Sequence, residues 1–258
     1  MQLNSQTSLQ AKVVAALLLV MPKHALLWHN EDTTPFECDG LTAYRQRPMV
    51  VALPETYEQV QGILKSCHAL GVPVVARGAG TGLSGGAMPH AAGVTLSLAK
   101  FNKILKLDAK SRTAVVQGGV RNLAISEAAA PLGLYYAPDP SSQIACTIGG
   151  NVAENSGGVH CLKYGLTVHN VLKVKGFTVE GEEVEFGSDA LDASGYDLLS
   201  LIVGSEGMLA VTTEVTVKLI PKPQLARCIM ASFDDIRKAG DAVAAVIAAG
   251  IIPAGLEM

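Results

Sequence analysis

The sequence predicts a fold that mixes α-helices with β-strands, and it begins with a β-α-β unit that is followed by a series of strands. Apolar runs at residues 49–53 and 72–76 predict two strands. Between them, apolar side chains recur at the 3.6-residue spacing of a helix that begins near Pro54 and closes at Gly71. Such a unit favours parallel strands with a right-handed crossover. The 258 residues suffice for one large domain or two ordinary ones.

The segment after residue 93 is dominated by predicted strands. Apolar and alternating patterns predict strands at 94–98, 104–107, 113–117 and 209–219, a helix at 122–130 and a hairpin at 171–186. The hairpin turns at Glu180-Gly181. The last strand alternates apolar and polar residues, which indicates a half-buried strand that Pro221 ends. The small residues of 138–158 are interpreted as a loop.

These elements divide the chain into three parts. Residues 1–45 form a helical lead with a polar connector, residues 46–223 form a strand-rich part, and residues 224–258 form a new unit. In the third part, strands are predicted at 227–233 and 251–258, on either side of a helix. Asp234 or Asp235 can cap that helix. One unit of about 35 residues cannot bury a core alone, so we expect the chain to be truncated or this unit to be completed elsewhere.

Composition argues against several classes of function. The net charge of −3 and the few aromatic side chains disfavour a nucleic-acid-binding surface. The apolar run at 13–21 is shorter than the about 20 residues that span a bilayer, and it predicts a helix ended near Pro22. The five cysteines form no C-x-x-C pair. We therefore expect a soluble, cytoplasmic protein with reduced thiols, no metal site and no transmembrane segment.

A glycine-rich segment directly after the second predicted strand indicates a phosphate site. It has five glycines between residues 78 and 86, whose exposed backbone N–H groups can form a concave anion site. Gly80, Gly82 and Gly85 match G-x-G-x-x-G, but no helix follows Gly86 and no acidic residue lies near Lys100, so a nicotinamide fingerprint is disfavoured. A glycine turn without any ligand is the alternative.

Two further small-residue segments, 138–158 and 204–211, strengthen the case for a ligand. Small residues let a flat ring lie against the backbone, and Ser, Thr and Asn side chains offer hydrogen bonds to a ribose or ribityl chain. Three such segments suit one extended ligand. A nucleotide with a pyrophosphate and a flavin ring is a ligand of this kind.

The three segments also carry a resemblance. They read R-G-A-G-T-G-L-S-G-G at 77–86, P-D-P-S-S-Q-I-A-C-T-I-G-G-N-V-A-E-N-S-G-G at 138–158 and G-S-E-G-M-L at 204–209. Tyr44-Arg45, H-C-L-K-Y-G at 160–165 and L-I-P-K-P at 219–223 agree with them. From about Pro35 to Met258, the chain resembles the vanillyl-alcohol-oxidase type of FAD-binding domain. It is more closely similar to the family of the FAD-linked D subunit of glycolate oxidase and its D-lactate dehydrogenase relatives.

The resemblance implies a PCMH-type fold of two α+β subdomains with FAD extended between them, followed by the start of a ferredoxin-like cap. Residues 46–223 would form the FAD-binding domain and 224–258 the beginning of the truncated cap, or substrate, domain. Backbone amides would hold the pyrophosphate at Arg77, Gly78, Ala79, Gly80, Thr81, Gly82, Leu83 and Ser84. The ribityl and flavin region would be lined by Pro138, Asp139, Pro140, Ser141, Thr147, Gly150, Asn151, Ser156 and Gly158. Glu206, Gly207 and Val211 would lie near the adenosine or ring end.

The activity implied by the resemblance is FAD-dependent oxidation of a D-2-hydroxy acid, glycolate or D-lactate, with hydride transfer to flavin N5. The electrons would pass to an iron–sulfur subunit, and a second FAD-domain subunit would belong to the same complex. These partners would bring a cytoplasmic protein to the inner membrane. The family's metal-binding histidine pair and substrate-binding basic residues have no counterpart here, and Ala210 stands in place of a glycine. The alternative is a non-catalytic or truncated flavin-binding subunit with an assembly role, and a peptidoglycan reductase that uses NADPH shares this fold.

Three single residues keep two interpretations each. His160 could polarise the flavin or a substrate, or it could be a structural residue. Cys146 and Cys161 could approach the flavin closely enough for covalent attachment, or they could be small buried apolar residues. No catalytic residue is assigned from the sequence.

Overall fold

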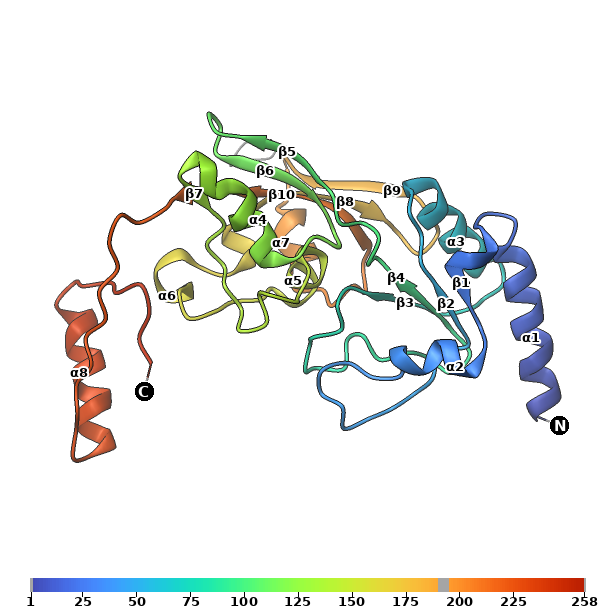
Figure 1. Ribbon diagram of the computed structural model, residues 1–258, viewed down its shortest axis with the longest axis horizontal. Helices are drawn as coiled ribbons and strands as arrows, with labels where there is room; N and C mark the ends of the chain where they lie inside the picture. The colour runs from blue at the N-terminus through green and yellow to red at the C-terminus, as the bar shows by residue number, and fades with distance from the viewer. Residues whose placement is uncertain (1, 190–194, 258) are drawn as a thin grey trace.

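Two β-sheets and the helices packed on them form the body of the protein, and the C-terminal segment extends from one end of it (Figure 1). The structure, a computed structural model, describes residues 2–189 and 195–257. The first sheet is built from residues before 98 and the second from residues 104–218. The predicted α+β fold of two subdomains is therefore confirmed.

The first subdomain contains a four-stranded sheet in the order β1 (Leu26–Leu27), β2 (Val50–Ala52), β4 (Val94–Ser97) and β3 (Val74–Arg77). Both β2 and β3 pair with β4 in parallel, as the predicted β-α-β unit requires. The helix between them, α3 (Tyr57–Ala69), begins three residues after Pro54, where its start was predicted. The Thr56 hydroxyl accepts the Gln59 N–H at its start, and Gly71 ends it with a φ of 63°.

The N-terminal helix α1 (Gln2–Leu17) packs on this subdomain. Val13 and Leu17 are fully buried, in the same core as Ile63 of α3 and Val50 of β2. Figure 1 shows α1, in blue, beside α3 at the end of the molecule opposite the C-terminal segment. The apolar run that is too short for a membrane thus covers the first sheet. No helix among the described residues is both long and apolar enough to cross a membrane.

The second subdomain contains a five-stranded antiparallel sheet in the order β5 (Ile104–Asp108), β6 (Thr113–Gln117), β10 (Val211–Lys218), β8 (Val171–Phe177) and β9 (Glu183–Gly187). The hairpin of β8 and β9 is as predicted. The predicted half-buried strand becomes β10, which lies in the centre of the sheet and is buried along most of its length. Its threonines at 212, 213 and 216 are buried with it, because residues of both hydrophobic cores pack on this strand.

Helices cover this second sheet. They are α4 (Asn122–Ala129), α5 (Ile148–Glu154) and α7 (Leu198–Ile202), and the short helix α6 (Cys161–Tyr164) follows α5 in the chain. The other short elements are α2 (Asn30–Thr33), the 3-10 turns η1 (Lys23–Ala25), η2 (Thr34–Phe36), η3 (Ala130–Leu132) and η4 (Thr167–His169), and the strand pair β7 (Leu134–Tyr135) and β11 (Ile220–Pro221). The helix α5 lies where a loop was predicted, because Ile148 and Val152 enter the second core with Val215.

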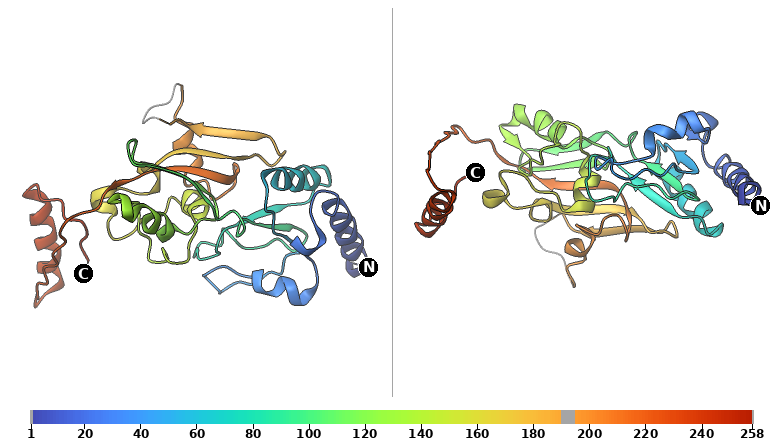
Figure 2. Two further views of the ribbon diagram at one scale, coloured as in Figure 1. Left: turned by 45° about the horizontal axis from the view of Figure 1, so that its top comes forward. Right: turned by 90° about the horizontal axis from the view of Figure 1, so that it is seen from below.

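Most of residues 224–257 lies away from this body in the views of Figures 1 and 2, and Gly255 returns to contact Val159. Helix α8 (Ile236–Ala248) forms as predicted, and the Asp235 carboxylate accepts the Arg237 N–H at its start. The strands predicted at 227–233 and, within the described residues, at 251–257 are wrong. A strand needs a neighbouring strand for its backbone hydrogen bonds, and none lies beside this segment, where Ile229 and Met230 are exposed.

Candidate functional site

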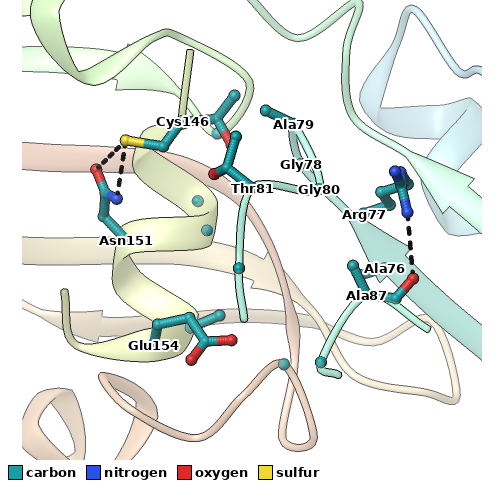
Figure 3. A pocket seen from close by; sticks show the side chains of 18 of the residues that line it. Ala76, Arg77, Gly78, Ala79, Gly80, Thr81, Ala87, Cys146, Asn151 and Glu154 are labelled. Carbon is teal, nitrogen blue, oxygen red and sulfur yellow. Dashed lines mark hydrogen bonds between the residues drawn. The ribbon is translucent and has the colours of Figure 1, made fainter. Parts of the chain in front are cut away.

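A cavity opens between the two subdomains, where the loop after β3 faces α5 (Figure 3). Its empty space, counted together with the solvent at its open mouth, is about 920 Å³. All three small-residue segments reach it, although they are far apart in the sequence. The lining comprises Ala76, Arg77, Gly78, Ala79, Gly80, Thr81, Gly82, Gly86, Ala87, Leu98, Gly118, Ser142, Cys146, Thr147, Gly149, Gly150, Asn151, Ala153, Glu154, Ser156, Glu206, Gly207, Ala210 and Thr212.

The first wall of the cavity is the glycine loop, residues 77–86. Gly80 has a φ of 70°, a conformation that glycine adopts without strain. At Gly78, a Cβ atom would collide with the Thr147 hydroxyl, so the two walls touch at a position where only glycine fits. The loop leads through residues 87–93 into β4 without a helix, which agrees with the sequence interpretation. This wall therefore presents backbone rather than side chains to the cavity.

Arg77 is the basic residue of this lining, but its guanidinium turns away from the cavity (Figure 3). It donates from Nη1 to the carbonyl oxygens of Cys38 and Ala87, at 2.8 Å and 3.3 Å. Burial lowers the pKa of Arg77, and the neighbouring Cys38 and Asp39 oppose that shift. An anion in the cavity would therefore depend on backbone N–H groups more than on a side-chain cation.

The second wall is built from α5 and the segment before it. Asn122, on α4, donates from Nδ2 to the Pro138 carbonyl at 3.1 Å and to Asn151 Oδ1 at 2.9 Å. Asn151 in turn donates to the Cys146 sulfur at 3.4 Å. Asn122, Pro138, Cys146 and Asn151 are all buried, and they tie α5 to the P-D-P segment. The network sets the distance between the two ends of this wall.

Thr147 stands out within the second wall. Its side chain is buried and its hydroxyl has no hydrogen-bond partner among the described residues, yet the residue lines the cavity. Buried hydroxyl groups are normally hydrogen-bonded, because an unpaired one costs about 1–3 kcal/mol. The orphaned hydroxyl is therefore an observation that a polar ligand group at this position would account for.

The third segment forms a turn at the cavity's edge. Glu206 has a φ of 54°, between positive-φ glycines at 204 and 207, which fits the predicted tight turn. The Glu206 N–H donates to the Ala153 carbonyl at 2.8 Å, and the Gly204 N–H donates to the Val152 carbonyl at 2.8 Å. The turn is thus fastened to α5. Ala210 also lines the cavity, and its methyl group is accommodated there.

The structure brings many of the predicted site residues together in this cavity: Arg77, Gly78, Ala79, Gly80, Thr81, Gly82, Thr147, Gly150, Asn151, Ser156, Glu206 and Gly207. Others do not line it: Leu83, Ser84, Pro138, Asp139, Pro140, Ser141, Gly158 and Val211. Val211 is buried in the core of the first subdomain. Ser84 donates to the Glu154 carboxylate at 3.0 Å and so closes the loop onto α5.

Asp139 and Gly158 contribute to a separate pair of side chains beside the cavity. The Asp139 carboxylate accepts the His160 backbone N–H at 3.2 Å, and its other oxygen lies 2.5 Å from His160 Nδ1. Gly158 packs so closely on Asp139 that a Cβ atom would collide with its carbonyl oxygen. His160 is therefore held by Asp139 in a fixed orientation, with its ring half exposed. Cys146 is buried, Cys161 is half-buried, and both are free thiols.

Sequence reasoning missed several lining residues, among them Ser142, Glu154 and Thr212, whereas Cys146, which it named as able to approach the flavin, does line the cavity. Ser142 directly follows the residues that the resemblance selected, and Glu154 lies one helical turn after Asn151. A helical interpretation of 148–154 would have found Glu154. Thr212 could be found only from the position of β10. Among the described residues, no cluster of three or more His, Cys, Asp or Glu side chains could hold a metal ion.

Known proteins with similar sequences agree with this geometry. Residues 48–187 match the model of a family described as the FAD binding domain. Over 249 residues, the chain is 63% identical to the glycolate oxidase subunit GlcD of Escherichia coli K12, covering 96% of this chain and 50% of that protein. It is 39% identical over 209 residues to a D-lactate dehydrogenase of Archaeoglobus fulgidus, covering 81% and 46%. The chain spans about half the length of the curated relatives it matches.

A solved structure shows the same fold. An alkyldihydroxyacetonephosphate synthase superposes with a TM-score of 0.81 at 22% sequence identity, covering 95% of this chain and 47% of that one. The family match spans more than half of this chain and includes both the glycine loop and α5. The cofactor predicted from the sequence, FAD, is thereby confirmed. The chain belongs to the family of FAD-binding domains of the PCMH type.

Proposed function

We propose that this protein oxidises a D-2-hydroxy acid, glycolate or D-lactate, with FAD as the hydride acceptor. The observation that carries the proposal is the 63% identity to a glycolate oxidase subunit along 96% of the chain, combined with a cavity between the two subdomains. Relatives named as D-lactate and D-2-hydroxyglutarate dehydrogenases support the same class of substrate. Bound FAD would supply N5 as the acceptor of the hydride from C2 of the substrate.

The glycine loop is proposed to hold the pyrophosphate through the backbone N–H groups of residues 77–84. Glycines let these groups approach a phosphate closely, and no side chain competes for the space. On the second wall, the Thr147 hydroxyl would donate to the cofactor and thereby gain the partner that it lacks. Asn151 is already committed to Asn122 and Cys146, so it would shape this wall rather than bind through free donors. The residues predicted at 138–141 and 158 would act indirectly, by fixing the positions of the Asp139 carboxylate and the His160 imidazole.

His160 is proposed as the protein group nearest to the reacting end. Asp139 orients the imidazole through Nδ1, which leaves Nε2 as the nitrogen that can accept a proton from a substrate hydroxyl or donate a hydrogen bond. The residue just before it, Val159, contacts Gly255 of the C-terminal segment. This places the pair where the body of the protein meets residues 224–257.

The remaining parts of the proposal concern the rest of the enzyme. Residues 46–223 would be the FAD-binding domain, and 224–258 would begin the cap domain that binds the substrate. The exposed apolar side chains of this segment, such as Ile229, Met230 and Ile236, support a further packing partner. Electrons would leave through an iron–sulfur subunit, in a complex that also contains a second FAD-domain subunit. The complex would work in the cytoplasm, at the inner membrane.

The test is an absorbance spectrum of the purified protein followed by anaerobic titration. We expect the bands of oxidised flavin, released on denaturation, and bleaching of these bands by glycolate or D-lactate but not by NADPH. A colourless protein that takes up no added FAD would contradict the proposal. Bleaching by NADPH alone would instead favour a reductase of the kind that acts on peptidoglycan precursors.

The alternative is a flavin-binding subunit with an assembly role and no activity of its own. Bound FAD without bleaching by any 2-hydroxy acid, alone or with partner subunits added, would support this role. Bleaching of the flavin bands when the partner subunits are added would instead support the oxidation of a D-2-hydroxy acid.

A further inference from the structure

A segment that the sequence presents only as a polar connector crosses the outside of the glycine loop. We call residues 36–46 the strap. The strap closes on itself, since the Gln46 N–H donates to the Glu37 carbonyl at 2.8 Å and Arg45 pairs with the Glu37 carboxylate at 2.7 Å. It lies outside the stretch that matches the FAD-binding family, which begins at residue 48.

Asp39 is the buried carboxylate of the strap, with 4% of its surface exposed. Its two oxygens accept from two different backbone N–H groups. Oδ1 accepts from Leu41 within the strap at 3.0 Å, and Oδ2 accepts from Gly85 of the glycine loop at 2.9 Å. Hydrogen bonds to a charged acceptor are about twice as strong as neutral ones. Asp39 therefore fastens the far end of the glycine loop to a segment 46 residues earlier in the chain.

Arg77 fastens the other end of the same loop. Its Nη1 bridges the Cys38 carbonyl of the strap and the Ala87 carbonyl just beyond the loop, and its guanidinium lies 5.8 Å from the centre of the Phe36 ring. Between these two ties the backbones touch directly. A Cβ atom at Gly40 would lie 2.8 Å from the Thr81 carbonyl oxygen. The strap thus supports the loop at its beginning, middle and end.

We propose that Asp39 and Arg77 are positioning residues for the cofactor: through the strap, they hold the glycine loop in the shape that presents its N–H groups to the pyrophosphate of FAD. The inference rests on the proposed function of that loop. It adds a segment outside the matched domain to the cofactor site. Neither side chain needs to touch the cofactor in this role.

Electrostatics and geometry predict opposite results when Asp39 loses its charge. Asp39→Asn keeps the size of the side chain, but its NH₂ group cannot accept, so one of the two N–H groups loses its partner. If the carboxylate acted only through its charge, its removal would leave Arg77 less compensated and would tighten the binding of an anion. If it acts by position, the loop loses its shape and binding weakens.

The experiment compares FAD with riboflavin, which lacks the phosphates, as ligands of the flavin-free protein. Dissociation constants are measured by flavin fluorescence for the natural protein, Asp39→Asn, Arg77→Lys and Arg45→Ala. Arg77→Lys keeps the charge but loses the planar fork. Arg45→Ala is the matched control, because it removes only an exposed ion pair of the strap. Thermal unfolding verifies that each variant is folded.

We expect Asp39→Asn to weaken FAD binding at least about tenfold and to leave riboflavin binding within about twofold, because one charged hydrogen bond is lost at the phosphate end only. Arg77→Lys should follow the same pattern, and it decides the matter if Asp39→Asn does not fold. Unchanged or tighter FAD binding by both variants would overturn the inference while the proposed function stands. Failure of the natural protein to bind FAD would instead remove the proposed function.

Discussion

The two walls of the cavity face the same space but are built in different ways. The glycine-loop wall is backbone over most of its length, and the one charged side chain at its start, Arg77, turns away to the strap. The α5 wall is built from side chains, with Asn122, Asn151 and Cys146 linked by hydrogen bonds behind the surface. One wall therefore depends on the absence of side chains, and the other depends on their correct pairing.

This difference shows how each wall keeps its shape. A glycine loop has a large conformational entropy when it is unsupported, so its shape has to come from contacts on its outer side. The strap provides these contacts. The α5 wall is preorganised from within, because the side-chain amides of Asn122 and Asn151 behind it are already hydrogen-bonded. Substitutions on the two walls should consequently separate into steric and hydrogen-bonding effects.

The largest effect is expected at Gly119, where the first subdomain meets the second. Its N–H donates to the Phe101 carbonyl at 2.7 Å, and a Cβ atom would collide with the backbone oxygen of Leu98. Backbone atoms on both sides cannot move aside, so Gly119→Ala should cost about 3 kcal/mol or more and lower the melting temperature by roughly 6–12 °C. Calorimetry or a circular-dichroism melt measures it. Gly240→Ala, in α8 with open space around it, is the control and should not lower the melting temperature.

A smaller loss is expected from Asn122→Ala, which disconnects the α5 wall from within. The buried Pro138 carbonyl and Asn151 amide would lose their partner, at a cost of roughly 2–3 kcal/mol. Urea unfolding would measure the loss, and FAD affinity should fall with it because the P-D-P segment is no longer tied to α5. If stability falls but FAD affinity does not, the second wall binds less of the cofactor than we propose.

Thr147→Val should act in opposite directions on the two states of the protein. Valine has the shape of threonine without the orphaned hydroxyl, so the flavin-free protein should become more stable by about 1 kcal/mol. The FAD-bound protein should lose about tenfold in affinity, since the proposed hydrogen bond to the cofactor is gone. Melting curves with and without FAD test both signs. A stabilisation of equal size in both states would show that this hydroxyl does not bind the cofactor.

The smallest effect is expected from Ser84→Ala, at the exposed bridge between the walls. The Ser84 hydroxyl and the Glu154 carboxylate meet at 3.0 Å, but both groups are open to water. Stability should therefore change by less than about 0.5 kcal/mol. The rate of FAD release, followed by fluorescence, should rise slightly because the bridge lies at the edge of the cavity. A large loss of stability would contradict this expectation and would show that the bridge holds the two walls together.

The parts of this architecture that local patterns encode could be predicted from the sequence. The β-α-β unit, the hairpin of β8 and β9 and the glycine loop each depend on residues close together in the chain. The three segments that line the cavity could be selected from the sequence because each is unusually rich in small residues. The alternating pattern predicted that β10 is a strand, but it did not predict that both faces of this strand are buried.

The remainder depended on contacts between distant residues. Gly149 and Gly150 are poor helix formers, so α5 exists because Ile148 and Val152 pack into the second core. Asp39 and Gly85 are joined by one hydrogen bond that no local sequence pattern predicts. The strands predicted after residue 224 had the right side chains but no neighbouring strand. In each case the structure was determined by tertiary contacts and not by the local secondary-structure propensity.

The place of β10 also governs the order in which the protein can be made. It is the last strand of the five-stranded sheet in the chain, yet it lies between β6 and β8, which are synthesised long before it. Until residue 218 has left the ribosome, β6 and β8 each have an edge without a partner, and such edges pair readily with other chains. The second subdomain therefore forms only after nearly the whole of it has been translated. A cell that overproduces this protein has to protect those two edges until the strand between them arrives.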